Sequence, residues 1–194
     1  MSSQNLNEGK VIIFSAPSGA GKTTIVRALL DVISELSFSI SACSRAPRGH
    51  EVNGKDYHFI GIEGFKNKIN NNEFVEWEEV YQDHFYGTLN SELTRIWNAN
   101  KTVVFDVDVV GGMSLKNKFG KKALAIFVMP PSLMVLEKRL RNRNTDSEQK
   151  IRQRLEKAEQ EISLSSGFDV ILKNDNLDIA ISDAKAIVNQ FLKS

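Results

Sequence analysis

The sequence has little cysteine, no long apolar run and almost no net charge. Cys43 is the single cysteine among 194 residues, which excludes an internal disulfide, and no cluster of cysteine and histidine has the spacing of a zinc site. A chain without disulfides fits a reducing compartment, so we expect a cytoplasmic protein.

The lack of a long apolar run and of a net charge excludes further classes of protein. The longest uninterrupted apolar run, ALAIFVM at 123–129, has seven residues, too few to cross a bilayer, and the polar first ten residues do not read as a secretory signal. Lysine and arginine total 25 against 24 acidic residues, so the overall charge indicates no nucleic-acid or membrane partner. With 41% hydrophobic residues, the chain has enough apolar surface for one globular domain.

Short β-rich runs alternate with segments of helical period. Such alternation predicts an α/β fold in which helices wrap a central parallel sheet. The predicted strands are VIIFS (11–15), FSISACS (38–44), VVFDVDV (103–109), ALAIFVM (123–129) and FDVILKN (168–174). The predicted helices lie in 23–36, 131–142 and 177–192. Because VIIF and ALAIFVM are apolar throughout, they are expected to be central strands covered on both faces.

Two segments differ from this alternation. Between Ala46 and Trp97 the runs are short, aromatic and half polar, which predicts a small β-rich insertion. From Glu137 to Glu161 the chain is strongly charged but keeps apolar residues at helical spacing, which predicts an exposed pair of helices. The single domain then divides into a core (about 9–45, 90–136 and 165–194), the insertion (about 46–89) and the helical pair (about 137–164).

The stretch SAPSGAGKTT, at 15–24, has the order of a phosphate-binding loop: strand, glycine-containing bend, lysine, hydroxyl, helix. Small residues let backbone N–H groups curl around phosphate oxygens, and the helix adds its N-terminal donors. Lys22 would reach the β and γ phosphates, and the Thr23 hydroxyl would ligate Mg²⁺. Ala16 stands where the pattern G-x-x-x-x-G-K-[ST] has glycine, which gives up easy access to positive φ. The loop predicts that the protein binds a nucleoside triphosphate, but it does not indicate which reaction the protein carries out.

Further residues are candidates for an acceptor site. Arg45 and Arg48 flank Pro47 just after a predicted strand, and two guanidinium groups on a stiff bend suit a phosphate monoester. Asp106 and Asp108 are two apart in VVFDVD, so in a strand they would point the same way at the carboxyl end, where parallel sheets bind ligands.

Taken together, the loop and four later runs resemble the guanylate kinases from about Val11 to the C-terminus. The runs are SRAPRGHEVNGKDYHF, FVEWEEVYQDHFYGT, VVFDVD and RLRNRNTDSEQKIRQRL, in this order. The resemblance implies transfer of the γ-phosphoryl group of ATP to GMP, giving ADP and GDP, in purine nucleotide metabolism and GMP recycling. It also implies Mg²⁺ as cofactor and ATP and GMP as small-molecule partners, and it leaves the oligomeric state open.

The resemblance also assigns GMP-binding residues by position. The phosphate of GMP would contact Arg45, Arg48, Tyr57 and Tyr86. Guanine would meet Ser41, Glu76 and Thr88, and Asp106 would lie on the acceptor side. The chemistry agrees, because one carboxylate can accept from the adjacent N1–H and N2–H₂ donors of guanine, while a hydroxyl suits O6.

In the resembled kinases the charged helical pair is a lid. Closed arginines would stabilise the charge that develops on the transferred phosphoryl group and would exclude water. The implied catalytic residues are Lys22, Arg45, Arg139, Arg143 and Arg154. The implied ATP-binding residues are Ala16, Pro17, Ser18, Gly19, Ala20, Gly21, Lys22, Thr23, Thr24 and Asn174. Asp108 would hold a magnesium-bound water, and Val110 replaces a glutamine that the family usually carries.

Three other functions are alternatives to this interpretation. A kinase of the same build that phosphorylates a ribose bisphosphate would have no use for Glu76, Tyr86 and Thr88. A guanylate-kinase-like scaffold that binds peptides would not need Lys22, Thr23 or the arginines of the lid. A switch GTPase would carry an N-K-x-D stretch after the loop, which the sequence lacks.

Overall fold

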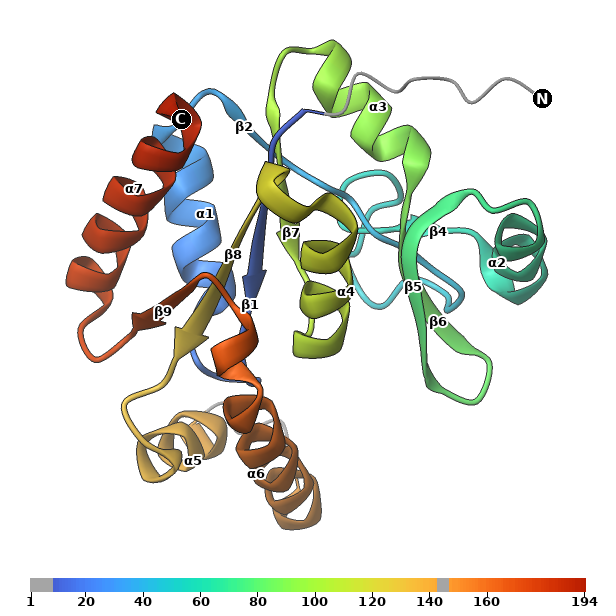
Figure 1. Ribbon diagram of the computed structural model, residues 1–194. Coiled ribbons are helices and arrows are strands. Elements are labelled where there is room, and N and C mark those ends of the chain that lie inside the picture. Colours follow the sequence, from blue (N-terminus) through green and yellow to red (C-terminus); the bar gives the residue numbers. More distant parts are fainter. Residues whose placement is uncertain (1–8, 143–146) are drawn as a thin grey trace. The chain divides into compact units, whose positions relative to one another are not determined.

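The computed structural model describes residues 9–142 and 147–194, which form two compact units (Figure 1). The smaller unit comprises Gly9 and Ser37–Val103, and the larger unit comprises Lys10–Leu36 and Val104–Ser194. No helix in these described ranges is long and apolar enough to cross a membrane.

The main sheet has five strands in the order β2-β7-β1-β8-β9. Its strands are β1 (Val11–Ser15), β2 (Leu36–Phe38), β7 (Thr102–Asp106), β8 (Ala123–Met129) and β9 (Val170–Lys173). β8 pairs in parallel with β1 on one side and with β9 on the other. Every residue of β1 is fully buried, so the prediction of apolar central strands is confirmed.

Three helices of the larger unit flank this sheet: α1 (Lys22–Val32), α4 (Val109–Phe119) and α7 (Leu177–Lys193). α1 packs against α7 on one side, whereas α4 packs on β1 and β8 (Figure 1). Two short 3₁₀ helices, η1 (Gly120–Lys122) and η2 (Ser165–Gly167), precede β8 and β9.

The helix α4 was not predicted from the sequence, because two glycines stand in its first turn. Gly112 is required there by packing: a Cβ atom at this position would lie 2.3 Å from Ser15 Oγ. The missing side chain lets α4 approach the end of β1 closely.

The predicted pair of charged helices is confirmed as α5 (Leu133–Asn142) and α6 (Glu148–Ser163). Their apolar residues form a separate small core of Leu136, Leu140 and Ala158, with Leu133 and Leu155 packed against it. On the surface Arg141 of α5 pairs with Glu137, 2.8 Å away, and with Glu148 of α6. The apolar core and this ion pair therefore hold the two helices together.

The smaller unit has a four-stranded sheet in the order β4-β3-β6-β5. The strands are β3 (Ala42–Cys43), β4 (His58–Phe59), β5 (Phe74–Tyr81) and β6 (His84–Leu89). Only the β3–β4 pair is parallel, and β6 runs antiparallel to both β3 and β5.

This unit also contains α2 (Gly61–Asn70) and α3 (Asn90–Asn98), which sequence analysis missed within the expected β-rich segment. Only one residue of α2, Phe65, is buried, and two of its ten residues are glycine, a poor helix former, so the sequence gives a weak helix signal. The Phe65 ring stacks on Phe74 and Phe85 at centroid distances of 4.3 and 5.4 Å. These three rings, with Ala42 and Leu89, form the core of the smaller unit.

Candidate active site

The loop between β1 and α1 is built around two glycines in the left-handed region. Gly19 has φ 95° and Gly21 has φ 97°. A Cβ atom at Gly21 would also lie 2.3 Å from Asn174 Nδ2. Gly21 is the N-cap of α1 and supplies no side-chain cap, so the first N–H groups of the helix are not capped by it. Ala16, which replaces the glycine of the motif, is not among the residues with positive φ, so alanine fits this position without strain.

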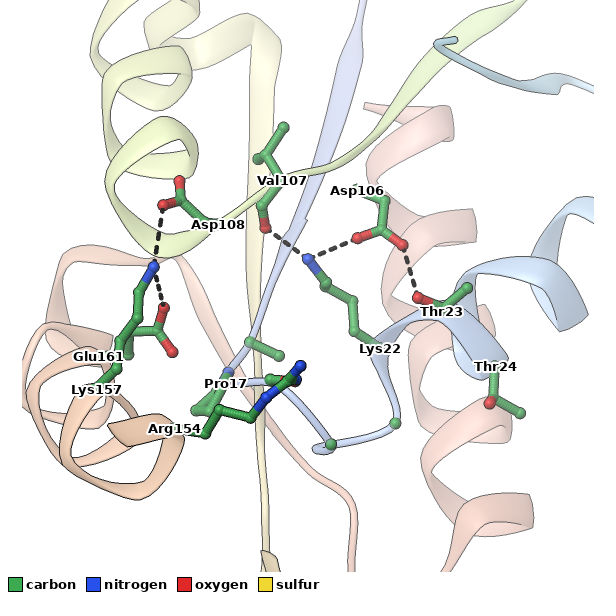
Figure 2. A pocket seen from close by; sticks show the side chains of 14 residues that line it. Pro17, Lys22, Thr23, Thr24, Asp106, Val107, Asp108, Arg154, Lys157 and Glu161 are labelled. Atoms are coloured by element: carbon green, nitrogen blue, oxygen red, sulfur yellow. Dashed lines mark hydrogen bonds and ion pairs between the residues drawn. The ribbon is translucent and has the colours of Figure 1, made fainter. Parts of the chain in front are cut away.

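Lys22, Thr23 and Asp106 form a hydrogen-bonded group at the carboxyl ends of β1 and β7 (Figure 2). Lys22 Nζ lies 2.6 Å from Asp106 Oδ1 and also donates to the carbonyl of Val107 at 2.6 Å. Thr23 Oγ1 donates to Asp106 Oδ2 at 3.0 Å. Asp106 thus contacts both residues predicted to handle triphosphate and Mg²⁺. Its assignment to GMP stays a prediction.

These residues line a pocket of about 390 Å³. The loop and residues 106–108 form one part of its wall, and Arg154, Lys157 and Glu161 of α6 form another. Arg154 Nη1 donates to Ser18 Oγ at 2.6 Å. The pocket therefore combines backbone donors with several cationic groups, an arrangement suited to a polyphosphate.

Lys157 and Glu161 were not singled out by sequence analysis. Lys157 Nζ lies 3.9 Å from Asp108 Oδ2 and 3.7 Å from Glu161 Oε1 (Figure 2). Burial raises the pKa of the Glu161 carboxyl above its ordinary value, although Lys157 opposes the shift. Lys157 and Glu161 are four residues apart, and α6 carries charges of both signs throughout. The sequence therefore did not distinguish this pair from the other charged residues of the helix.

Asp108 has a local role that the strand prediction missed. β7 ends at Asp106, and Asp108 is the N-cap of α4, where its Oδ1 accepts from the Gly111 N–H at 2.8 Å. The expectation that the two carboxylates share one strand face is therefore wrong. Val110, in the place of the usual glutamine, is 61% exposed in the first turn of α4.

Arg139 and Asn174 brace the backbone of the loop. Asn174 Nδ2 and Arg139 Nη1 both donate to the carbonyl of Ala20, at 2.6 and 3.3 Å. Arg139 Nη2 also donates to the carbonyl of Asn174 at 3.1 Å. Ala20 and Asn174 are buried, so this contact supports the loop rather than lining the pocket. Arg143 lies outside the described residues.

In the smaller unit, Arg45 is the centre of a second polar cluster. Its guanidinium makes two hydrogen bonds to Glu51, Nη1 to Oε2 at 2.6 Å and Nη2 to Oε1 at 2.7 Å. Arg45 Nε donates to the Tyr86 hydroxyl at 3.0 Å, and the guanidinium lies 5.1 Å from the centre of the Tyr57 ring. Three predicted phosphate-binding residues are thereby brought together.

Glu51 was missed by sequence analysis. Its carboxylate also accepts from the Arg48 backbone N–H at 2.7 Å, whereas the Arg48 side chain is exposed. The hydrogen bonds from Arg45, followed by that from Arg48, lower the pKa of Glu51 to about 2. Burial raises the pKa of the Tyr57 hydroxyl, so it remains a neutral donor. Because the ionised Glu51 pairs with Arg45, it offsets the positive charge of Arg45 within the cluster.

The predicted guanine-binding residues follow the register of three neighbouring strands. Glu76 on β5 pairs directly with Thr88 on β6. Ala42 on β3 pairs with Gly87, so Ser41, one residue earlier, is next to Thr88 in the antiparallel register. Thr88 is fully buried, and its Oγ1 has no hydrogen-bond partner among the described residues. A buried hydroxyl without a partner is uncommon in folded proteins and calls for an explanation.

The parallel sheet and the glycine-containing loop at the end of its central strand define a P-loop nucleotide-binding protein. Comparisons with known proteins specify the family. A family profile described as guanylate kinase matches residues 8–191. The chain belongs to the guanylate kinase family, which confirms the resemblance found in the sequence.

Individual relatives agree over almost the whole chain. The chain is 51% identical over 184 residues to a guanylate kinase of Porphyromonas gingivalis, covering 94% of this chain and 98% of the relative. It is 44% identical over 184 residues to a guanylate kinase of Myxococcus xanthus, covering 94% and 87%. The crystal structure of a guanylate kinase from Anaplasma phagocytophilum superposes with a TM-score of 0.74 at 26% identity, covering 94% of this chain and 85% of that one.

Proposed function

We propose that this protein transfers the γ-phosphoryl group of ATP to GMP, giving ADP and GDP. The observation that carries the proposal is the contact of Lys22 and Thr23 with Asp106 in the loop pocket, within a chain of the guanylate kinase family. A scaffold that only bound peptides would have no need of this arrangement.

The larger unit would bind ATP. The N–H groups of the loop and α1 receive the phosphates, and Lys22 moves from Asp106 to the β and γ phosphates when they arrive. Arg154 already donates to Ser18 in the loop, so a small change of its side chain brings it to the triphosphate. Its charge then offsets the negative charge that develops during transfer.

The smaller unit would bind GMP. Arg45, Tyr57 and Tyr86 supply donors for the phosphate monoester, and the row of Ser41, Thr88 and Glu76 supplies a hydroxyl and a carboxylate for guanine. Arg48 is a further proposed contact of the GMP phosphate in this unit.

Mg²⁺ is the proposed cofactor. No group of three or more histidine, cysteine, aspartate or glutamate residues that could hold a metal occurs in the described ranges. However, Mg²⁺ commonly takes few protein ligands and completes its shell with water and phosphate oxygens. The Thr23 hydroxyl and the Asp106 carboxylate, 3.0 Å apart in the pocket, offer the oxygen ligands that suit it. Bound there with ATP, the ion would neutralise phosphate charge, and Asp108 would contact it through water.

The test is to measure ADP formation from ATP and Mg²⁺ with GMP, AMP, UMP and CMP in turn. We expect GMP to give by far the highest kcat/KM, because the other bases cannot offer Glu76 two adjacent donors in the same geometry. Equal rates with all four nucleotides, or no ADP formation with GMP, would overturn the proposal.

A further inference from the structure

Glu92 is a buried carboxylate in the first turn of α3, in the smaller unit. Its side chain is 6% exposed. Arg95 Nε and Nη2 donate to its two oxygens at 3.0 and 2.9 Å. A buried charge is costly unless it is paired and hydrogen-bonded, and Arg95 alone would provide the pairing.

Two further contacts extend beyond α3. The backbone N–H of Ile40 donates to Glu92 Oε2 at 3.1 Å, and His58 Nε2 lies 3.4 Å from Glu92 Oε1. Since a carboxylate only accepts, this contact requires the His58 tautomer with a proton on Nε2. One carboxylate therefore joins three separate segments of the chain: the start of α3, the segment before β3, and β4.

Two of the joined segments adjoin a residue proposed to bind GMP. Ile40 precedes Ser41, and His58 follows Tyr57. The two segments are also bonded to each other, because the His58 N–H donates to the carbonyl of Ser41 at 2.9 Å. α3 itself begins two residues after Thr88 of β6. A shift of the Glu92 carboxylate would therefore move Ser41 and Tyr57 together.

A purely local role does not account for this arrangement. A glutamate in the first turn of a helix can favour the helix dipole while exposed to water. Glu92 is instead buried away from water, and it accepts hydrogen bonds from a loop and a strand outside its helix. Burial by itself would raise the pKa of the Glu92 carboxyl, but the donors of Arg95 and Ile40 hold that pKa below its ordinary value, so Glu92 is ionised at neutral pH.

We propose that Glu92 is a positioning residue of the acceptor site, whose carboxylate fixes the backbone at Ile40 and the ring of His58 and so holds Ser41 and Tyr57 in place for GMP. This inference rests on the proposed function. It adds a residue that contacts no substrate and acts through its neighbours.

The test compares Glu92→Gln and Glu92→Ala with the wild type. The amide keeps the shape and one acceptor, which can still serve Ile40, whereas alanine removes every contact. We expect the KM for GMP to rise about tenfold in Glu92→Ala and about threefold in Glu92→Gln. We expect the KM for ATP and the kcat at saturating GMP to stay within about twofold, because the loop pocket is untouched.

A matched control is Glu73→Ala. Glu73 is a carboxylate of the same unit that pairs with Lys68 at 2.6 Å, with its side chain 40% exposed; its loss should leave both KM values unchanged. Unfolding by urea separates stability from positioning. If Glu92→Ala does not fold, Glu92→Asp, which keeps the charge on a shorter side chain, replaces it and should raise the KM for GMP.

Variants that are folded but less stable, with an unchanged KM for GMP, would overturn the positioning role and leave the proposed function intact. A wild-type protein without activity on GMP would overturn both.

Discussion

Arg45 and Glu51 form a bidentate pair, with both guanidinium Nη atoms bonded to the two carboxylate oxygens at 2.6 and 2.7 Å. Arg45 also donates to the Tyr86 hydroxyl and to the carbonyl of Ala46. Four of its five N–H groups are therefore used within the smaller unit. The arginine is fixed in direction, and a phosphate must either use the fifth donor or compete with Glu51.

The first prediction depends on the planar guanidinium of Arg45 and its several donors. Arg45→Lys keeps the charge, but an ammonium group cannot bond to both oxygens of Glu51 and to Tyr86 in one geometry. We expect the KM for GMP to rise about tenfold or more. Arg48→Lys is the matched control with a smaller expected effect, since the Arg48 side chain is exposed. A larger effect at Arg48 than at Arg45 would contradict the assignment.

Lys22→Ala should remove catalysis and leave the fold intact. Lys22 contacts Asp106 and Val107 in the pocket and acts on phosphate charge, so kcat should fall at least about 100-fold. Circular dichroism and thermal melting check the fold. A variant that kept more than half of the wild-type kcat would show that the loop does not bind the reacting phosphates.

Arg154→Ala should lower kcat by about 10- to 100-fold and change GMP affinity little, because its contact with the loop strengthens as charge develops. Arg152→Ala is the control, since Arg152 is an exposed residue of the same helix that does not line the pocket. We expect the same result for Arg143→Ala from the family resemblance alone. Loss of GMP binding with unchanged kcat would place Arg154 on the acceptor side.

Glu76→Gln tests how the base is selected. The amide offers an oxygen to one guanine donor but turns its NH₂ toward the other, so GMP should lose roughly 1–3 kcal/mol of transition-state binding. The measurement is the ratio of kcat/KM for GMP to that for AMP, with Glu63→Gln, an exposed position, as control. An unchanged ratio would mean that Glu76 does not read the base, and would favour the ribose-phosphate kinase.

Glu161→Gln should stabilise the protein at high pH. Because burial raises the pKa of Glu161 above 4.5, the folded state binds a proton more readily than the unfolded state. The contribution of Glu161 to the free energy of unfolding is therefore fully present below about pH 4.5. It is lost as the pH rises through the higher pKa of this carboxyl in the folded state. The variant avoids that loss, so its Tm should exceed that of the wild type at pH 8, and the difference should disappear at pH 4.

Thermal melts without nucleotide measure this difference. Glu159→Gln, on the exposed face of the same helix, should show no such dependence. A wild type that is more stable than Glu161→Gln at pH 8 would mean that the ion pair with Lys157 outweighs burial.

The parts of the fold that sequence predicted best are those set by local pattern. ALAIFVM coincides with β8, since a short apolar run with β-branched and aromatic residues favours a strand covered on both faces. The loop was equally clear, because its glycines and lysine are needed at fixed spacing. α4 escaped notice because two glycines weaken its helix signal, and one of them, Gly112, serves packing against Ser15, a contact between residues nearly one hundred positions apart.

In the site, too, local pattern predicted some residues but not their distant partners. Residue types and order singled out Lys22, Thr23 and Arg45 as candidates. Their partners could not be found this way: the contact of Asp106 with Lys22 depends on β7 and β1 being neighbours, and that of Glu51 with Arg45 depends on how the intervening bend turns. Carboxylates are common in any sequence, so only three-dimensional placement distinguishes these from surface charges.

The isolation of Cys43 has a practical consequence for spectroscopy. Its side chain has no exposed surface, and burial raises the pKa of its thiol, so the reactive thiolate is scarce and shielded. A cysteine introduced at an exposed position of α6, as in Arg152→Cys, would then be the one fast-reacting thiol of the chain. A fluorophore or spin label could be attached there without removing any native residue for the purpose, and movement of the α5–α6 pair could be followed during turnover.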